Sequence, residues 1–190
     1  QTVLGANGQI ATELARELRR SCTSDVRLVS RNPRKVNETD SLASANLLDA
    51  KQTLDAVKGS SVVYFTAGLP PDTGLWERQF PAMLRNALDA CRAQGARFAY
   101  FDNTYMYPQD DRLQTEETPF APVGRKGIGK WTLAIAGLFS KQVSEIRELL
   151  PRYEQDNLFD STKFKRRFPE FEVTTYREGL ELIRREWAGR

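Results

Sequence analysis

The N-terminal half of the chain alternates between short apolar runs and amphipathic segments. The apolar runs predict four strands, at residues 2–4, 26–30, 61–66 and 98–102. Apolar residues at intervals of three and four predict helices between them, at about residues 10–18, 51–58 and 76–94. Strands that alternate with helices imply parallel pairing through right-handed crossovers. The pattern therefore predicts an α/β fold with a doubly wound parallel sheet.

The same spacing predicts which side of each helix faces the sheet. The first helix is expected to bury Ile10, Ala11, Leu14, Ala15 and Leu18. The short helix is expected to turn Leu54 and Val57 inward. The long helix is expected to bury Phe80, Met83, Leu84, Ala87, Leu88 and Cys91. Gly95 follows the long helix, and glycine is the usual residue at a helix C-terminus because it adopts left-handed backbone angles.

The remainder of the chain has a different pattern. Residues 103–130 lack periodicity and are rich in Pro, Asp, Glu and Gly, which is typical of a long functional loop. Helices are predicted at residues 142–150, 161–167 and 176–187, the last with a capping box at residues 175–178. Its apolar face is expected to contain Leu180, Leu182 and Ile183. We therefore expect two parts, residues 1–130 and a small, mostly helical part at residues 131–190.

Composition narrows the class of protein. The 190 residues are 40% apolar and 28% charged, which indicates a globular chain, and the longest apolar runs are too short to cross a bilayer. The N-terminal segment does not read as a secretory signal, so we expect a cytoplasmic protein without a membrane partner. A net charge of +3 does not favour a nucleic-acid partner, although residues 163–167 are basic. Since the chain has no His, a His-dependent triad or zinc site is excluded and no metal site is expected.

A glycine turn joins the first strand to the first helix. Such a turn leaves backbone N–H groups unpaired at the positive end of the helix dipole, where a pyrophosphate binds. In the spacing Gly5, Gly8 and Ala11, the first glycine makes the tight turn, the second admits the phosphates and the alanine lets the helix pack closely. The residues expected to contact the cofactor here are Gly5, Asn7, Gly8, Gln9 and Ile10. A purely structural turn is the alternative.

The end of the second strand indicates which dinucleotide binds. An acidic residue there would accept a hydrogen bond from the ribose 2′-hydroxyl of NAD. The chain instead has Ser30 and Arg31, followed by Arg34, which offer a hydroxyl and two cations to a 2′-phosphate. This favours NADP over NAD as the cofactor. The alternative is an exposed basic loop with no ligand.

Together, these motifs resemble the extended or atypical short-chain dehydrogenase/reductase superfamily, which contains NAD(P)-dependent epimerases, dehydratases and reductases. The resemblance implies a Rossmann-like sheet, a small-molecule substrate and a possible homodimer through the helix at residues 76–94. It places Asn46 and Leu47 beside the adenine. It also assigns to the cofactor site the loop after the family's fourth strand, which corresponds to Thr66, Ala67 and Gly68.

The family's catalytic pattern, a Ser or Thr followed by Tyr-x-x-x-Lys, is matched only in part. The serine position corresponds to Asn103, with Thr104 beside it. The tyrosine position corresponds to Lys126 and the lysine position to Lys130. A lysine beside a second lysine can have a lowered pKa and so donate a proton. Tyr105 and Tyr107 are the other hydroxyls near this loop, and packing at the strand end explains them as well as catalysis does.

After its lysine, the family normally continues with a long helix, a further strand and a large substrate domain. Here Lys130 leads almost directly into the C-terminal pattern, so either that domain is reduced or residues are missing from the sequence. The leading hypothesis is an NADP-dependent oxidoreductase or epimerase/dehydratase-like enzyme acting on an unidentified carbonyl or sugar-type substrate. The alternative is a catalytically impaired NADP-binding sensor or regulatory module. A structural domain that binds no nucleotide is the third possibility.

Overall fold

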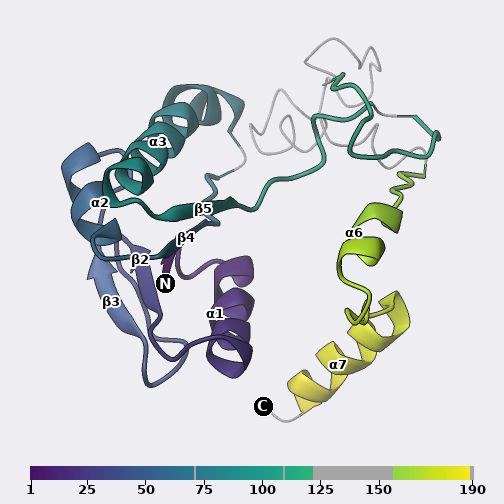
Figure 1. Cartoon of the computed structure of the whole chain (residues 1–190), viewed down its shortest axis with the longest axis horizontal. Coiled ribbons are helices and arrows are strands. Elements are labelled where there is room, and N and C mark those ends of the chain that lie inside the picture. The colour runs from purple at the N-terminus through teal and green to yellow at the C-terminus, as the bar shows by residue number, and fades with distance from the viewer. Residues whose placement is uncertain (71, 109, 122–155, 189–190) are drawn as a thin grey trace, which may run out of the picture.

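A five-stranded parallel sheet forms the centre of the computed structural model, which describes residues 1–70, 72–108, 110–121 and 156–188 (Figure 1). The strands are β1 (Thr2–Leu4), β2 (Arg27–Ser30), β3 (Ser41–Ser44), β4 (Val62–Phe65) and β5 (Arg97–Tyr100). The helices are α1 (Gln9–Ser21), α2 (Ala50–Val57), α3 (Thr73–Gln94), α6 (Thr162–Arg167) and α7 (Tyr176–Ala188). The strand order is β3-β2-β1-β4-β5, and every pairing is parallel. The predicted Rossmann-like α/β class is therefore confirmed.

Helices cover both faces of this sheet, as a doubly wound fold requires. Figure 1 shows α1 on one face and α2 with α3 on the other. Successive residues of a strand point to opposite faces. In β4, Val63 and Phe65 accordingly pack in the core beneath α2 and α3, while Tyr64 packs against the core beneath α1. Burial on both faces explains why the predicted strands are continuous apolar runs rather than alternating ones.

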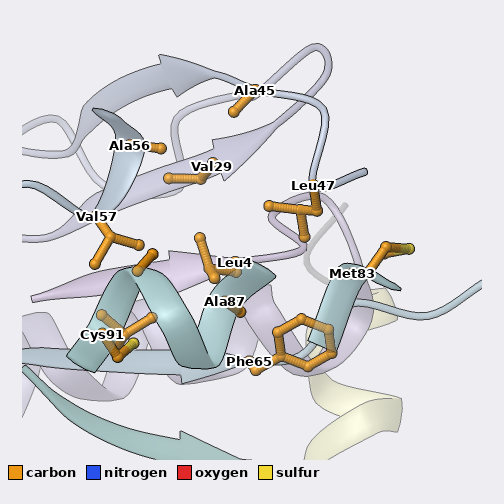
Figure 2. Packing of buried hydrophobic residues seen from close by; sticks show 12 residues of the cluster. Leu4, Val29, Ala45, Leu47, Ala56, Val57, Phe65, Met83, Ala87 and Cys91 are labelled. Carbon is orange, nitrogen blue, oxygen red and sulfur yellow. The ribbon is translucent and has the colours of Figure 1, made fainter. Parts of the chain in front are cut away.

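The larger core lies between the sheet and α3. Figure 2 shows Met83, Ala87 and Cys91 of α3 on the side of the helix that faces Leu4 and Phe65. The ring of Phe65 also meets a group of other aromatic rings at centroid distances of 5.8, 6.0 and 5.8 Å, those of Phe80, Phe98 and Tyr100. This aromatic packing joins β4, β5 and α3 into one unit.

Two expectations about this region are wrong, and one strand was not predicted. Ile10 is 44% exposed because it lies in the first turn of α1, beyond the end of β1. Leu88 is 42% exposed because the buried stripe of α3 runs through Ala87 and Cys91 and leaves it to one side. The strand β3 was not predicted: it is rich in Ser and Ala and pairs only with β2, so the ladder rather than its own composition forms it.

The described C-terminal segment packs against the loop after β5. Gln114 and Phe159 form a parallel bridge, and the Lys163 ammonium lies 2.8 Å from the Glu117 carboxylate. The predicted capping box of α7 is confirmed, since the Thr175 amide donates to Glu178 Oε2 at 2.7 Å and the Glu178 amide donates to Thr175 Oγ1 at 3.3 Å. The predicted apolar face of this helix is exposed. The predicted helix at residues 142–150 lies outside the described residues.

Among the described helices, none combines the length and the apolar character needed to cross a membrane. The predicted homodimer through α3 stays a prediction, as does the division at residue 130, which lies outside the described residues.

Candidate functional site

A cavity of about 760 Å³ lies at the carboxyl ends of the strands. It opens beside β1, which has β2 on one side and β4 on the other. The chain passes from β1 to β2 and β3 and then returns past β1 to β4, and this reversal is the topological switch point of a doubly wound sheet. The residues expected to contact the cofactor all line it: Gly5, Asn7, Gly8, Gln9, Ile10, Ser30, Arg31, Asn46, Leu47, Thr66, Ala67 and Gly68. The structure thus brings together four loops that are far apart in the sequence.

The turn after β1 is held against the end of β2. The amides of Gly5 and Ala6 both donate to the Val29 carbonyl, at 2.9 and 3.0 Å. Gly5 has a φ of +95°, and a Cβ atom on it would lie 2.5 Å from the backbone of Ala67. Gly8 is different, because its φ is −76° and a Cβ there would meet only the Gly5 carbonyl, at an ordinary 3.5 Å. The backbone therefore requires glycine at position 5 and leaves space for a Cβ atom at position 8.

The first turn of α1 presents backbone N–H groups to the cavity. Gly8 is the N-cap and has no side chain, so it makes no side-chain capping bond. The first intrahelical bond runs from the Thr12 amide to the Gly8 carbonyl at 3.0 Å. The N–H groups at the start of a helix have no acceptor within it and form the positive end of its dipole. Gln9 and Ile10, which line the cavity, belong to this turn.

The loop after β2 carries the positive charge of the site. Arg31 lines the cavity, whereas Arg34 does not. No carboxylate in the described part of the chain forms an ion pair with either guanidinium, while the Lys35 ammonium donates to the Glu38 carbonyl at 2.8 Å. Asn7 reaches this loop from the glycine turn: its side-chain amide donates to the Asn32 carbonyl at 2.8 Å. The cations therefore lie in a loop that is tied to the glycine turn.

The capping of α2 shapes the wall formed by residues 45–48. Asp49 is the N-cap, and its carboxylate accepts from the Gln52 amide at 3.0 Å. The Gln52 side chain in turn accepts from the Asn46 amide at 2.9 Å. From the opposite side, the Asn86 side chain of α3 donates to the Leu47 carbonyl at 2.9 Å. Asn46 and Leu47, the residues expected beside the adenine, are thus each held by a hydrogen bond between their backbone and a helix side chain.

Sequence reasoning missed part of the lining. The additional residues are Ala6, Asn32, Ala45, Leu48, Leu69, Pro70, Leu75, Gln79 and Met83. Three of them, Leu75, Gln79 and Met83, follow one another at intervals of four on α3. A polar Gln79 within that stripe was a usable signal, because a sheet-facing stripe is otherwise apolar.

The expected catalytic residues are not brought to this cavity by the described structure. Asn103 and Thr104 follow β5 and do not line it. The side-chain oxygen of Asn103 accepts from the Tyr105 amide at 2.7 Å, so this amide group shapes its own loop. Lys126 and Lys130 lie outside the described residues. The catalytic assignment therefore stays a prediction.

Two tyrosines near the end of β5 are held by packing. The ring of Tyr107 contacts Phe120 and Phe159 edge-on, at centroid distances of 5.6 and 6.0 Å, as the packing interpretation of this residue expects. Burial, together with a hydrogen bond to Asp102, raises the pKa of Tyr100 to about 12. Tyr100 is therefore a protonated, structural hydroxyl at neutral pH.

Solved structures that share this fold include three dehydrogenases. A uronate dehydrogenase from Agrobacterium tumefaciens, complexed with NAD, is 24% identical with a TM-score of 0.53, over 64% of this chain and 48% of that one. A glucuronic acid dehydrogenase from Chromohalobacter salexigens is 19% identical with a TM-score of 0.56, over 64% and 47%. A GalE-like L-threonine dehydrogenase from Cupriavidus necator is 21% identical with a TM-score of 0.52, over 64% and 43%. The chain spans less than half the length of each.

Sequence comparison places this fold in a family. No curated protein sequence matches the chain. The model of a family described as NAD(P)H-binding matches residues 5–118, which include the glycine turn, the whole sheet after β1 and every predicted cofactor contact. The match agrees with the resemblance to short-chain dehydrogenases and epimerases that the motifs predict. The chain therefore belongs to the NAD(P)H-binding family of Rossmann-fold proteins.

Proposed function

We propose that the chain is the NADP-binding part of an oxidoreductase or an epimerase- or dehydratase-like enzyme. The observation that carries the proposal is the cavity of about 760 Å³, because its wall combines helix N–H groups, a cation and an apolar floor. Sites for small ligands and cofactors are mostly apolar clefts with a few placed polar groups. The start of α1 supplies the polar groups for a pyrophosphate, and Leu47 and Met83 supply apolar surface.

The preference for NADP rests on the end of β2. Ser30 and Arg31 line the cavity there, and none of the described residues that line it is acidic. A guanidinium binds a phosphate through charge-assisted hydrogen bonds, which contribute more than neutral ones. NADH has no phosphate on this ribose, so it would leave Arg31 without a ligand. NADPH is therefore expected to bind more tightly than NADH.

The bound nicotinamide would supply or accept a hydride, and the chain's own residues would bind and orient the cofactor. In this proposal, residues 1–130 hold the cofactor and residues 131–190 are the remnant of a substrate domain. Asn103, Thr104, Lys126 and Lys130 are the proposed groups that position the substrate or move its proton. The substrate is a small molecule with a carbonyl or sugar group.

Calorimetric titration with NADPH and NADH tests the cofactor assignment directly. We expect NADPH to bind at least about tenfold more tightly and to raise the melting temperature, because a ligand specific to the folded state stabilises it. Arg31→Ala is expected to weaken NADPH and leave NADH unchanged, whereas Arg85→Ala, which removes an exposed arginine of α3, should change neither. Failure of both cofactors to bind contradicts the proposal.

One observation favours a second candidate, a module of the same fold that senses NADP without catalysis. The Asn103 side-chain oxygen accepts a backbone hydrogen bond from Tyr105 and the residue lies outside the cavity lining. An amide also cannot act as a proton donor in the way a tyrosine hydroxyl can. Incubation with NADPH and a panel of carbonyl and sugar-nucleotide substrates separates the two. Turnover that depends on Lys126 supports the enzyme, and tight binding without any turnover supports the sensor.

A further inference from the structure

We infer that Asn7 sets the cofactor selectivity of this site from a distance, by fixing the glycine turn to the loop that carries Arg31. The inference rests on the proposed NADP site and changes the part expected of Asn7 within it. Asn7 is a positioning residue: its side chain bonds to the protein, and Arg31 contacts the 2′-phosphate.

The side chain of Asn7 makes three hydrogen bonds, one to the last residue of β2 and two to the loop that follows it. Its Nδ2 donates to the Asn32 carbonyl at 2.8 Å and to Ser30 Oγ at 3.3 Å. Its Oδ1 accepts from the Arg34 amide at 3.1 Å. These bonds surround Arg31 in the sequence, with one before it and two after it. They determine how far Arg31 stands from the turn that receives the pyrophosphate.

Few residue types could take this place. The backbone of Asn7 has a φ of +85°, a left-handed conformation that glycine, asparagine and aspartate adopt most readily. The three bonds need a donor and an acceptor on one short side chain. Aspartate offers acceptors only, and glycine offers no side chain. Asparagine meets both the backbone and the side-chain requirement.

Apart from the bonds of Asn7, few side-chain hydrogen bonds among the described residues hold the loop near Arg31. The Ser44 hydroxyl donates to the Arg31 carbonyl at 2.7 Å, which ties the loop to β3. Among the described residues, the side-chain bonds from the loop to the glycine turn are those of Asn7. Loss of Asn7 would therefore leave Arg31 attached to β3 but free to move relative to the turn. NADPH needs both groups at a fixed spacing, whereas NADH needs only the turn.

Substitution by glycine separates the two requirements, because Asn7→Gly keeps the left-handed backbone and removes the three bonds. We expect it to lower the ratio of NADPH affinity to NADH affinity by about three- to tenfold, since an exposed hydrogen bond contributes about 0.5–1.5 kcal/mol. Thr12→Ala is the matched control: its hydroxyl bonds the Gly8 carbonyl at 3.0 Å in the same turn without touching the loop. It should leave the ratio unchanged.

A double-mutant cycle tests whether the effect passes through the cation. In an Arg31→Ala background, Asn7→Gly should no longer change the affinity ratio. Amide hydrogen exchange of Arg34 in the free protein gives a readout without cofactor, and it should be faster in Asn7→Gly than in the wild type. The inference is overturned if the ratio is unchanged, if both affinities fall equally, or if the effect persists without Arg31. If the wild type binds neither cofactor, the proposed function fails first and the selectivity inference fails with it.

Discussion

Gly5 and Ala67 approach so closely that a Cβ atom on Gly5 would lie 2.5 Å from both the backbone nitrogen and the Cα of Ala67. This contact joins the end of β1 to the end of β4, and the Thr66 amide reinforces it by donating to the Leu4 carbonyl at 2.9 Å. At this point no side chain separates the end of β1 from the end of β4. The fold therefore requires glycine at position 5.

Replacement of this glycine should destabilise the protein. In Gly5→Ala, the new methyl group meets backbone atoms that cannot rotate away, and the φ of +95° is strained for alanine. We expect a loss of about 2–4 kcal/mol in the free energy of unfolding, measured by urea denaturation. Gly68→Ala is the control, since a Cβ there has no atom within 4 Å. Equal stability of the two variants would show that the β1–β4 approach is less tight than described.

A single carboxylate should reverse the cofactor preference. Ser30→Asp places an acidic group at the end of β2, where it can accept from a ribose 2′-hydroxyl and repels a 2′-phosphate. We expect NADPH affinity to fall by roughly ten- to a hundredfold and NADH affinity to be kept or improved. Ser61→Asp adds the same charge at the opposite edge of the sheet and should change neither affinity. Parallel titrations with the two cofactors decide the matter, and an unchanged preference in Ser30→Asp would count against a 2′-phosphate site.

The aromatic cluster around Phe65 should dominate the stability of the sheet. Phe65 is fully buried among three other rings, so Phe65→Ala removes its contacts and leaves a cavity. We expect a loss of about 3–5 kcal/mol in the free energy of unfolding. Phe101→Ala removes the same ring at a site that is 60% exposed, and a change of about 0.5 kcal/mol is expected. Denaturant titrations of both variants test this, and similar losses would contradict the packing described here.

Alkaline pH should weaken the protein through Tyr100. Burial and the Asp102 carboxylate raise its pKa in the folded state from 10.0 to about 12. Above pH 10 the unfolded chain therefore loses this proton while the folded chain keeps it, so stability falls as pH rises from about 10 to about 12. The free energy of unfolding should decline less steeply over this range in Tyr100→Phe. Tyrosinate absorbance gives a second check, because one tyrosine fewer should ionise at about pH 12 in that variant.

The part of the fold that local chemistry controls was predictable from the sequence. The segment from β1 through the Gly5 turn into α1 was predictable because an apolar run, a glycine and an amphipathic repeat follow one another directly. The four loops that supply cofactor contacts could be named from motifs, since parallel strands deliver their carboxyl ends to one edge. For the same reason the family was evident before the structure.

Features that depend on neighbours distant in the sequence became visible in the three-dimensional structure. β3 exists because β2 offers it a ladder, and its own residues give little sign of it. Ile10 is exposed because β1 ends before reaching it, which no helical periodicity reveals. Asn7 lines the cavity, and its side chain also makes three bonds to Ser30, Asn32 and Arg34, which the sequence did not indicate. Hydrogen bonds between loops depend on the distance and direction of groups that sequence spacing does not specify.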